Sequence, residues 1–190
     1  MIAAIILFQA IPLASPHWAP ESAIRVWIDS SAAPTAGVAL IEKALQTWTH
    51  AADGRLTLSR TSSRDQADIT VRFVASDAVY GETAPRVDGA KRYIVSAAIA
   101  INATGPPDPL DARIVVYLTA LHELGHALGL SHTDDARDIM YRFRAADDGE
   151  RFFATYRKRL ASVADIGGTT ATGLSPHDVS ALRALYDSPH

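Results

Sequence analysis

The feature that most constrains this chain is a short run that begins at His122 and ends at His132, with the sequence His-Glu-Leu-Gly-His-Ala-Leu-Gly-Leu-Ser-His. On a helix, the imidazoles of His122 and His126 project from the same face and can share one metal ion. Gly129 allows the chain to turn sharply after that helix, so that His132 can return as a third nitrogen ligand. The sequence therefore predicts a helix that ends at a metal site.

The ligand types indicate which chemistry this site supports. Three neutral imidazoles leave a fourth position for water, which is the pattern of a catalytic zinc site and not of a structural one. Glu123 lies between two of the ligands in sequence and is predicted to be the general base that takes a proton from water and returns it to the leaving amine. The competing interpretation, a surface helix with three solvated histidines, is weak because the extended spacing fixes five positions.

Met140 follows the third histidine in the segment Asp138-Ile139-Met140-Tyr141. A methionine alone is most often core packing. At this distance behind such a histidine motif, it resembles the methionine turn that ends a known zinc-peptidase signature, which implies an apolar floor beneath the histidines. Met140 and Gly129 are therefore predicted to support the site structurally.

Hydrophobic periodicity predicts an α+β domain over residues 16–190. We expect strands at 24–29, 56–59, 68–74, about 80–87 (a short edge strand in the loop 75–92) and 93–101. We expect helices at 36–51, from a cap at Asp111 to Leu128, at 151–163, and from Pro176 onward with Ser175 as its cap.

Composition excludes several classes of function. The length of 190 residues favours one domain, and a formal net charge of −3 lacks the basic footprint of a nucleic-acid-binding protein. The chain has no cysteine, which removes disulfides, a thiol nucleophile and a thiolate that caps a catalytic zinc. We expect a monomer.

The N-terminal residues 1–15 are apolar but too few to span a bilayer comfortably. They resemble the apolar region of a signal peptide, although no Lys or Arg precedes them and no clear cleavage site follows. We favour a secretion signal over a buried or truncated segment. The protein is then expected outside the cell or in the cell envelope, without a stable membrane span.

Together, the zinc motif and the methionine behind it resemble those of the matrixin branch of the metzincin zinc peptidases. The resemblance extends from Trp18 to Asp187 and includes Thr133, the strand segment 67–73, the helical segment 41–48 and the C-terminal segment 178–186. It implies a metzincin catalytic domain with a twisted mixed sheet, an active-site helix and a C-terminal helix. It also implies an endopeptidase that binds a protein or peptide substrate in extended form along an edge strand.

Departures from this family limit what the resemblance implies. The loop 75–92 contains no histidine, so the additional structural zinc of animal matrixins has no ligands there. Asp77, Glu82 and Asp88 leave calcium possible, but no clear calcium motif supports it. Residues 142–174 are longer than the usual connection and are expected to shape the wall of the main specificity pocket.

The remaining conspicuous residues have ordinary interpretations. His17, His50, His177 and His190 are predicted to be surface or capping residues, and Trp18, Trp27 and Trp48 to be core residues. Tyr141 is expected to pack rather than to approach the substrate. Asp134, Asp135 and Asp138 are interpreted as a solvated turn, with a partner for a zinc histidine as the alternative. Asp178 has two equally favoured interpretations, as charge at a helix N-terminus and as a brace behind the Met140 turn.

Three functions therefore compete. The first is a secreted zinc endopeptidase. The second is a catalytically silent zinc-binding domain, which the presence of Glu123 argues against. The third is a zinc hydrolase that acts on a non-peptide amide, which His132 and Met140 argue against.

Overall fold

The computed structural model describes residues 15–76, 79–90, 92–106, 108–145 and 147–187. Its strands are β1 (Ser22–Ile28), β2 (Leu56–Arg60), β3 (Ile69–Val74), β4 (Gly81–Val87) and β5 (Ile94–Asn102). They form one sheet in the order β2-β1-β3-β5-β4, in which only β4 runs antiparallel to its neighbour. The predicted α+β fold with a mixed sheet is confirmed, and so is the edge strand within the loop 75–92.

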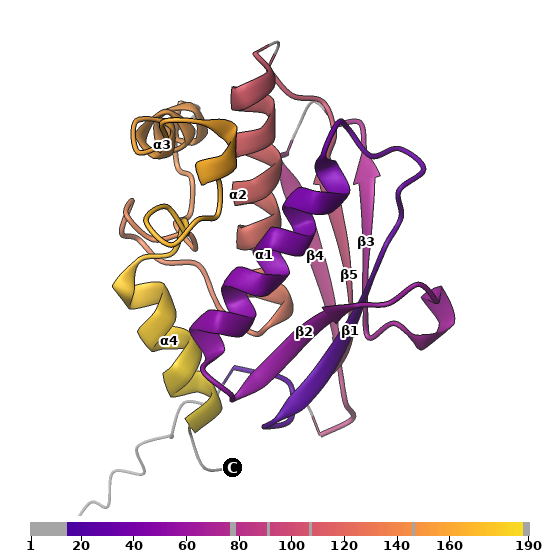
Figure 1. Cartoon of the computed structure of the whole chain (residues 1–190). Coiled ribbons are helices and arrows are strands. Elements are labelled where there is room, and N and C mark those ends of the chain that lie inside the picture. Colours follow the sequence, from indigo (N-terminus) through magenta and orange to yellow (C-terminus); the bar gives the residue numbers. More distant parts are fainter. Residues whose placement is uncertain (1–14, 77–78, 91, 107, 146, 188–190) are drawn as a thin grey trace, which may run out of the picture.

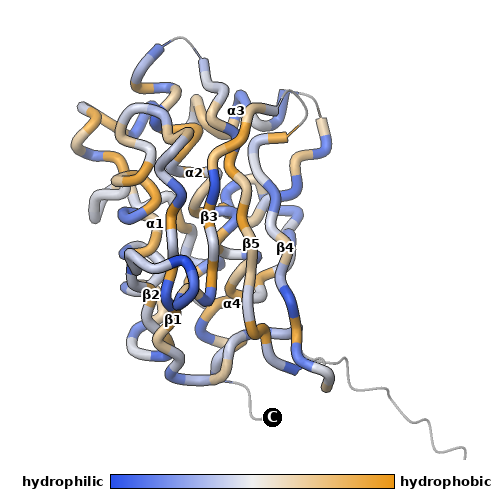
Figure 2. The backbone as a smooth tube through the Cα atoms, turned by 90° about the vertical axis from the view of Figure 1, so that its right-hand side faces the viewer, coloured by the Kyte–Doolittle hydropathy of each residue, from blue (hydrophilic) through white to orange (hydrophobic). Residues whose placement is uncertain are grey.

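The helices are α1 (Gly37–Ala52), α2 (Pro109–Ala127), α3 (Asp148–Arg157) and α4 (Pro176–Asp187), with short 3-10 turns at Arg64–Gln66 and Val163–Asp165. Figure 1 shows α1 and α2 packed together against one face of the sheet, with α3 and α4 farther from it. Figure 2 shows that the helices lie behind the sheet when its opposite face is viewed. The core therefore lies between the sheet and the α1/α2 layer.

Alternation along β1 explains which face of the sheet is buried. Ile24, Val26 and Ile28 are buried against the helices, whereas Trp27 lies on the opposite face, half-buried, with the Arg64 guanidinium 5.5 Å from its ring centre. The prediction that Trp27 is a core residue is wrong, because strand periodicity places it on the uncovered face. Trp18 and Trp48 are in the core, as predicted.

Two helix boundaries differ from the predictions. The cap of α2 is Asp108, whose side chain accepts hydrogen bonds from the amides of Leu110 and Asp111, with Pro109 in the first turn. Asp111 is therefore inside the helix, because proline is favoured at the first helical position and Pro109 can begin the helix. Helix α3 begins before residue 151 and ends well before residue 163.

The prediction that His17 is a surface or capping residue is wrong, because its side chain is buried. Its ring packs edge-on against Tyr93 and Tyr186. His50 and His177 are exposed as predicted, whereas His190 lies outside the described residues. Residues 1–14, which make up nearly all of the predicted signal, also lie outside them. Among the residues that the structure describes, no helix is both long and apolar enough to cross a membrane.

Candidate active site

Helix α2 carries the first half of the metal motif and is buried on nearly all sides. Two tryptophans fix its C-terminal half. The Trp48 indole N–H donates to the Leu121 carbonyl at 2.8 Å, and the Trp18 indole N–H donates to the Ala127 carbonyl at 2.7 Å. The second contact satisfies a carbonyl that the helix end leaves without a partner. The helix is thereby held in place immediately beside its histidines.

A glycine turn returns the chain from α2 to His132. Gly129 has a φ of +101°, its amide donates to the His126 carbonyl, and the Leu130 amide donates to the Gly125 carbonyl. These two bonds form a Schellman motif, which favours glycine at this position. A side chain at Gly129 would also collide with the main chain of Pro16. The turn predicted at Gly129 is present, and it brings His132 beside the helix.

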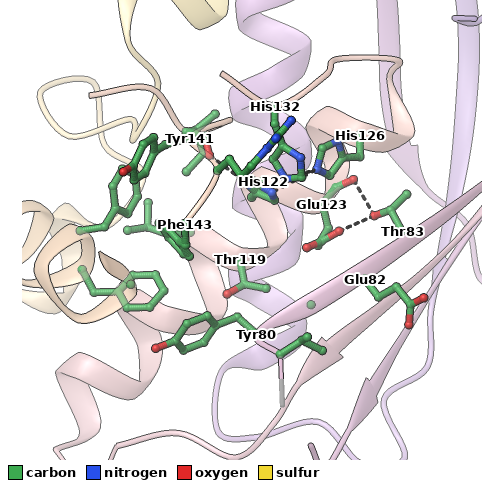
Figure 3. Close-up of a pocket in the computed structure, with 18 of the residues that line it drawn as sticks. Tyr80, Glu82, Thr83, Thr119, His122, Glu123, His126, His132, Tyr141 and Phe143 are labelled. Atoms are coloured by element: carbon green, nitrogen blue, oxygen red, sulfur yellow. Dashed lines mark hydrogen bonds between the residues drawn. The ribbon is translucent and has the colours of Figure 1, made fainter. Parts of the chain in front are cut away.

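The three predicted ligands converge. The Nε2 atom of His126 lies 3.1 Å from Nε2 of His122 and 3.2 Å from Nε2 of His132 (Figure 3). Nitrogens that share a tetrahedral zinc ion are separated by about 3.4 Å, given Zn–N bonds of about 2.1 Å. The spacing therefore fits one metal ion with three histidine ligands.

The other ring nitrogens of two ligands are already engaged. His122 Nδ1 donates to the Ile139 carbonyl at 2.6 Å, and His126 Nδ1 donates to the Leu130 carbonyl at 2.9 Å. Because a carbonyl only accepts, these contacts place the proton on Nδ1 and leave the Nε2 lone pair for a metal. Burial lowers the pKa of His122 to about 4 and also lowers the pKa of His126 and of His132. All three rings are therefore neutral at pH 7, the form that binds zinc.

Met140 packs against α2 beside the three predicted ligands. Its side chain is buried against Gly125, where a Cβ atom would collide with the Met140 sulfur. Its main chain pairs with the segment after His132, because the Thr133 amide donates to the Met140 carbonyl at 2.8 Å and the Arg142 amide donates to the Thr133 carbonyl at 3.0 Å. The turn thus supports both the helix and the third histidine.

The Ile139 peptide links this turn to the C-terminal helix. Its carbonyl accepts from His122, and its amide donates to Asp178 Oδ2 at 2.9 Å. Asp178 also accepts from the Ser175 amide, and the Ser175 hydroxyl accepts from the Asp178 amide, which makes a reciprocal cap of α4. Asp178 therefore fulfils both predicted roles, and Ser175 is the cap that the sequence predicted.

The interpretation of the acidic cluster as a solvated turn is wrong for Asp138. Its side chain is buried and accepts from the Ser175 hydroxyl and from His177 Nδ1, each at 2.7 Å. It touches no metal ligand directly and instead ties the Met140 turn to the start of α4. Asp134 is exposed and pairs with Arg144.

Glu123 lies next to the three histidines and is almost fully buried. Its carboxylate Oε2 lies 2.7 Å from the Thr83 hydroxyl, on the edge strand β4 (Figure 3). Burial raises the pKa of Glu123 to about 7, while the hydrogen bond from Thr83 acts in the opposite direction. A carboxyl with such a pKa can both accept and release a proton near neutral pH.

A cavity of about 550 Å³ opens beside the histidines. One wall is formed by β4, another by α2, and the outer wall by five aromatic side chains, Tyr80, Tyr141, Phe143, Phe152 and Phe153. Their rings pack mostly edge to face; the Tyr80 and Phe153 centres are 4.9 Å apart. Residues from 142 onward thus line the cavity as predicted, and Tyr141 lines it as well as packing.

Asp148 organises this outer wall. Its side chain accepts hydrogen bonds from the amides of Arg144 and Ala145 and from the Tyr141 hydroxyl, and it pairs with Arg151. These donors hold the pKa of Asp148 well below its usual range. The wall-forming segment is therefore folded around one buried carboxylate.

The loop 75–92 contributes Thr83 and Gly81 to the surroundings of Glu123, and neither was predicted from the sequence to be a site residue. Of the acidic residues that left calcium possible, Glu82 is exposed and lines the cavity, and Asp88 Oδ1 accepts from the amides of Arg92 and Tyr93. Asp77 lies outside the described residues.

Known proteins resemble this chain in sequence. The family model described as Matrixin matches residues 24–156. Stromelysin-1 of Mus musculus is 30% identical over 163 residues, which cover 78% of this chain and 28% of that protein. Interstitial collagenase of Oryctolagus cuniculus is 33% identical over 107 residues, which cover 53% of this chain and 22% of that protein. The chain thus spans roughly a quarter of the length of these relatives.

Proposed function

Because this chain belongs to the matrixin family, we propose that it is a zinc-dependent endopeptidase that acts on peptides bound in extended form. The observation that carries the proposal is the convergence of three imidazole Nε2 atoms directly beside the buried carboxylate of Glu123. The apolar residues 1–15 support action outside the cytoplasm as a secreted protein, which stays a prediction.

His122, His126 and His132 would hold the zinc ion. When bound, zinc makes a water molecule more acidic and polarises the scissile carbonyl group. The histidines fit this ion because two of their Nδ1 atoms are committed to carbonyl oxygens and their Nε2 atoms face a common point.

Glu123 would move the proton. Its carboxylate accepts a proton from the attacking water and delivers the same proton to the nitrogen of the leaving amine, so that no covalent enzyme intermediate is required. Burial raises its pKa, which strengthens the carboxylate as a base near neutral pH.

Strand β4 and the aromatic cavity would bind the substrate. As the last strand of the sheet, β4 pairs with β5 on one side and offers its other edge to an extended peptide. A side chain next to the scissile bond then enters the cavity. Its aromatic walls favour a large apolar side chain.

The first prediction tests the activity itself. Purified protein supplied with zinc is expected to cleave a denatured protein within its chain, and a chelator is expected to abolish cleavage until zinc is restored. Fragment masses distinguish internal peptide-bond cleavage from removal of terminal residues or from hydrolysis of a non-peptide amide. A protein that holds zinc but cleaves no unfolded substrate is a silent zinc-binding domain.

The second prediction concerns the cavity. Phe143 is partly exposed and its ring lies 5.7 Å from that of Phe152 and 6.2 Å from that of Tyr80, so Phe143→Ala enlarges the cavity with little effect on the core. We expect kcat/KM for a peptide with leucine in the cavity to fall by about tenfold, and that for the matching alanine peptide to change little. The exposed Val95→Ala, on β5, is the control. Equal losses for the two peptides would exclude Phe143 from specificity.

A further inference from the structure

We propose that Thr83 is a positioning residue for Glu123: its hydroxyl holds carboxylate Oε2, so that Oε1 is directed toward the attacking water. This inference rests on the proposed peptidase function. Thr83 touches no metal ligand or substrate atom in this role, and it acts entirely through Glu123.

The contact between the two residues is short and well placed. Thr83 Oγ1 lies 2.7 Å from Glu123 Oε2 and 2.9 Å from the Glu123 carbonyl oxygen (Figure 3). A carboxylate held by one hydrogen bond at a single oxygen cannot rotate freely about its last side-chain torsion. A general base requires this restriction, because a displacement of about 1 Å can cost ~100-fold in rate.

Gly81 leaves space for the other carboxylate oxygen of Glu123. A Cβ atom at this position would lie 2.7 Å from Glu123 Cγ and 2.8 Å from Oε1. Two residues earlier on β4 than Thr83, the glycine therefore leaves room for Oε1 while the threonine engages Oε2. The two positions share one face of the strand, because side chains alternate along it.

The position of Thr83 also ties the base to the substrate-binding strand. In the sheet, Thr83 is paired with Ile99 of β5, whose side chain is fully buried. The hydroxyl therefore projects from a strand that the core holds in register. A peptide added to the free edge of β4 pairs with the same strand that fixes Glu123. One strand therefore sets the position of the scissile bond relative to the carboxylate.

The experiment compares Thr83→Val, which removes the hydroxyl at nearly constant shape, with Thr83→Ser, which keeps it. In zinc-loaded protein we expect Thr83→Val to lower kcat about 10- to 100-fold with KM within about twofold, and Thr83→Ser to retain most of kcat. Thr57→Val makes the same chemical change at an exposed position of the opposite edge strand, β2, and is the control. Zinc content is measured for every variant.

A double-mutant cycle separates positioning from a structural role. In a Glu123→Gln background, Thr83→Val is expected to cause no further loss of residual kcat, because the amide that Thr83 then holds takes no proton from water. Equal loss in Thr83→Ser and Thr83→Val, or an additive loss in the Glu123→Gln background, would overturn the proposal.

The melting temperature (Tm) provides a readout that does not depend on cleavage. Thr83→Val is expected to lower Tm by roughly 3–6 °C with Glu123 present and by clearly less in a Glu123→Ala background. If the wild-type protein cleaves no peptide, the proposed function fails and this cycle alone decides the inference. Unequal Tm losses then support the pairing of hydroxyl and carboxylate, and equal losses overturn it.

Discussion

Glu123→Gln is expected to cut peptide hydrolysis by at least ~10²–10⁴-fold while zinc content and fold stay intact. Glutamine has nearly the same shape and can still accept a hydrogen bond from Thr83, but its amide cannot take a proton from water. The histidine Nδ1 contacts to Ile139 and Leu130 do not involve Glu123, so the metal ligands keep their orientation. The relevant measurements are kcat/KM on a fluorogenic peptide, zinc by elemental analysis and the Tm.

Glu150 offers a matched control for this substitution. It is exposed on α3 and does not line the cavity, so Glu150→Gln removes the same charge from a group outside the proposed proton path. Its hydrolysis rate is expected to stay within a few-fold of wild type. If Glu123→Gln cleaves peptides at a rate near that of wild type, Glu123 is not the base, and the mechanism is wrong even with the metal site correct.

His126→Ala is expected to have a different effect, with the loss of both bound zinc and activity. Its Nε2 atom is the one that lies within about 3 Å of both other ligand nitrogens, and its Nδ1 atom also holds the turn at Leu130. Zinc affinity should fall by more than the 10–100-fold typical for loss of a partner that only orients a ligand. Titration with a competing chelator measures this affinity directly.

Thermal stability provides a second test of the proposed zinc site. Zinc bound by α2 and by the segment after its turn raises Tm in wild-type protein through binding linkage, and this increase should be absent in His126→Ala. His50→Ala removes an exposed histidine from the last turn of α1 and should leave the zinc-dependent increase unchanged. A His126→Ala protein that retains one tightly bound zinc would show that the metal lies elsewhere.

The parts of the fold and site that the sequence predicts are those fixed by local geometry. Histidines one helical turn apart must share a face, and glycine after a helix favours the left-handed turn that returns His132. The periodicity of apolar residues likewise predicts α1 and the strands, because alternation or a helical repeat is a property of a short segment.

The contacts of the fold and site that the sequence does not predict join residues that are distant from each other along the chain. The contact between Thr83 and Glu123 joins positions 40 residues apart, and that between Ile139 and Asp178 joins positions 39 apart. No spacing rule connects such pairs before the sheet and helices are assembled. The same reason explains Asp138, which looks like a solvated turn residue until α4 brings Ser175 and His177 to it.

The separation of the outer cavity wall from the catalytic groups has a consequence for divergence. Phe143, Phe152 and Phe153 belong to a segment folded around Asp148, whereas the proposed ligands and the proposed base belong to α2 and the turn after it. We therefore expect mutations at Phe152, Phe153 and their neighbours on α3 to change which peptides are accepted while the proposed ligands stay in place. Lineages, or randomised libraries selected for cleavage of a new target, would then explore substrate preference on α3 while inheriting an unaltered proposed catalytic centre.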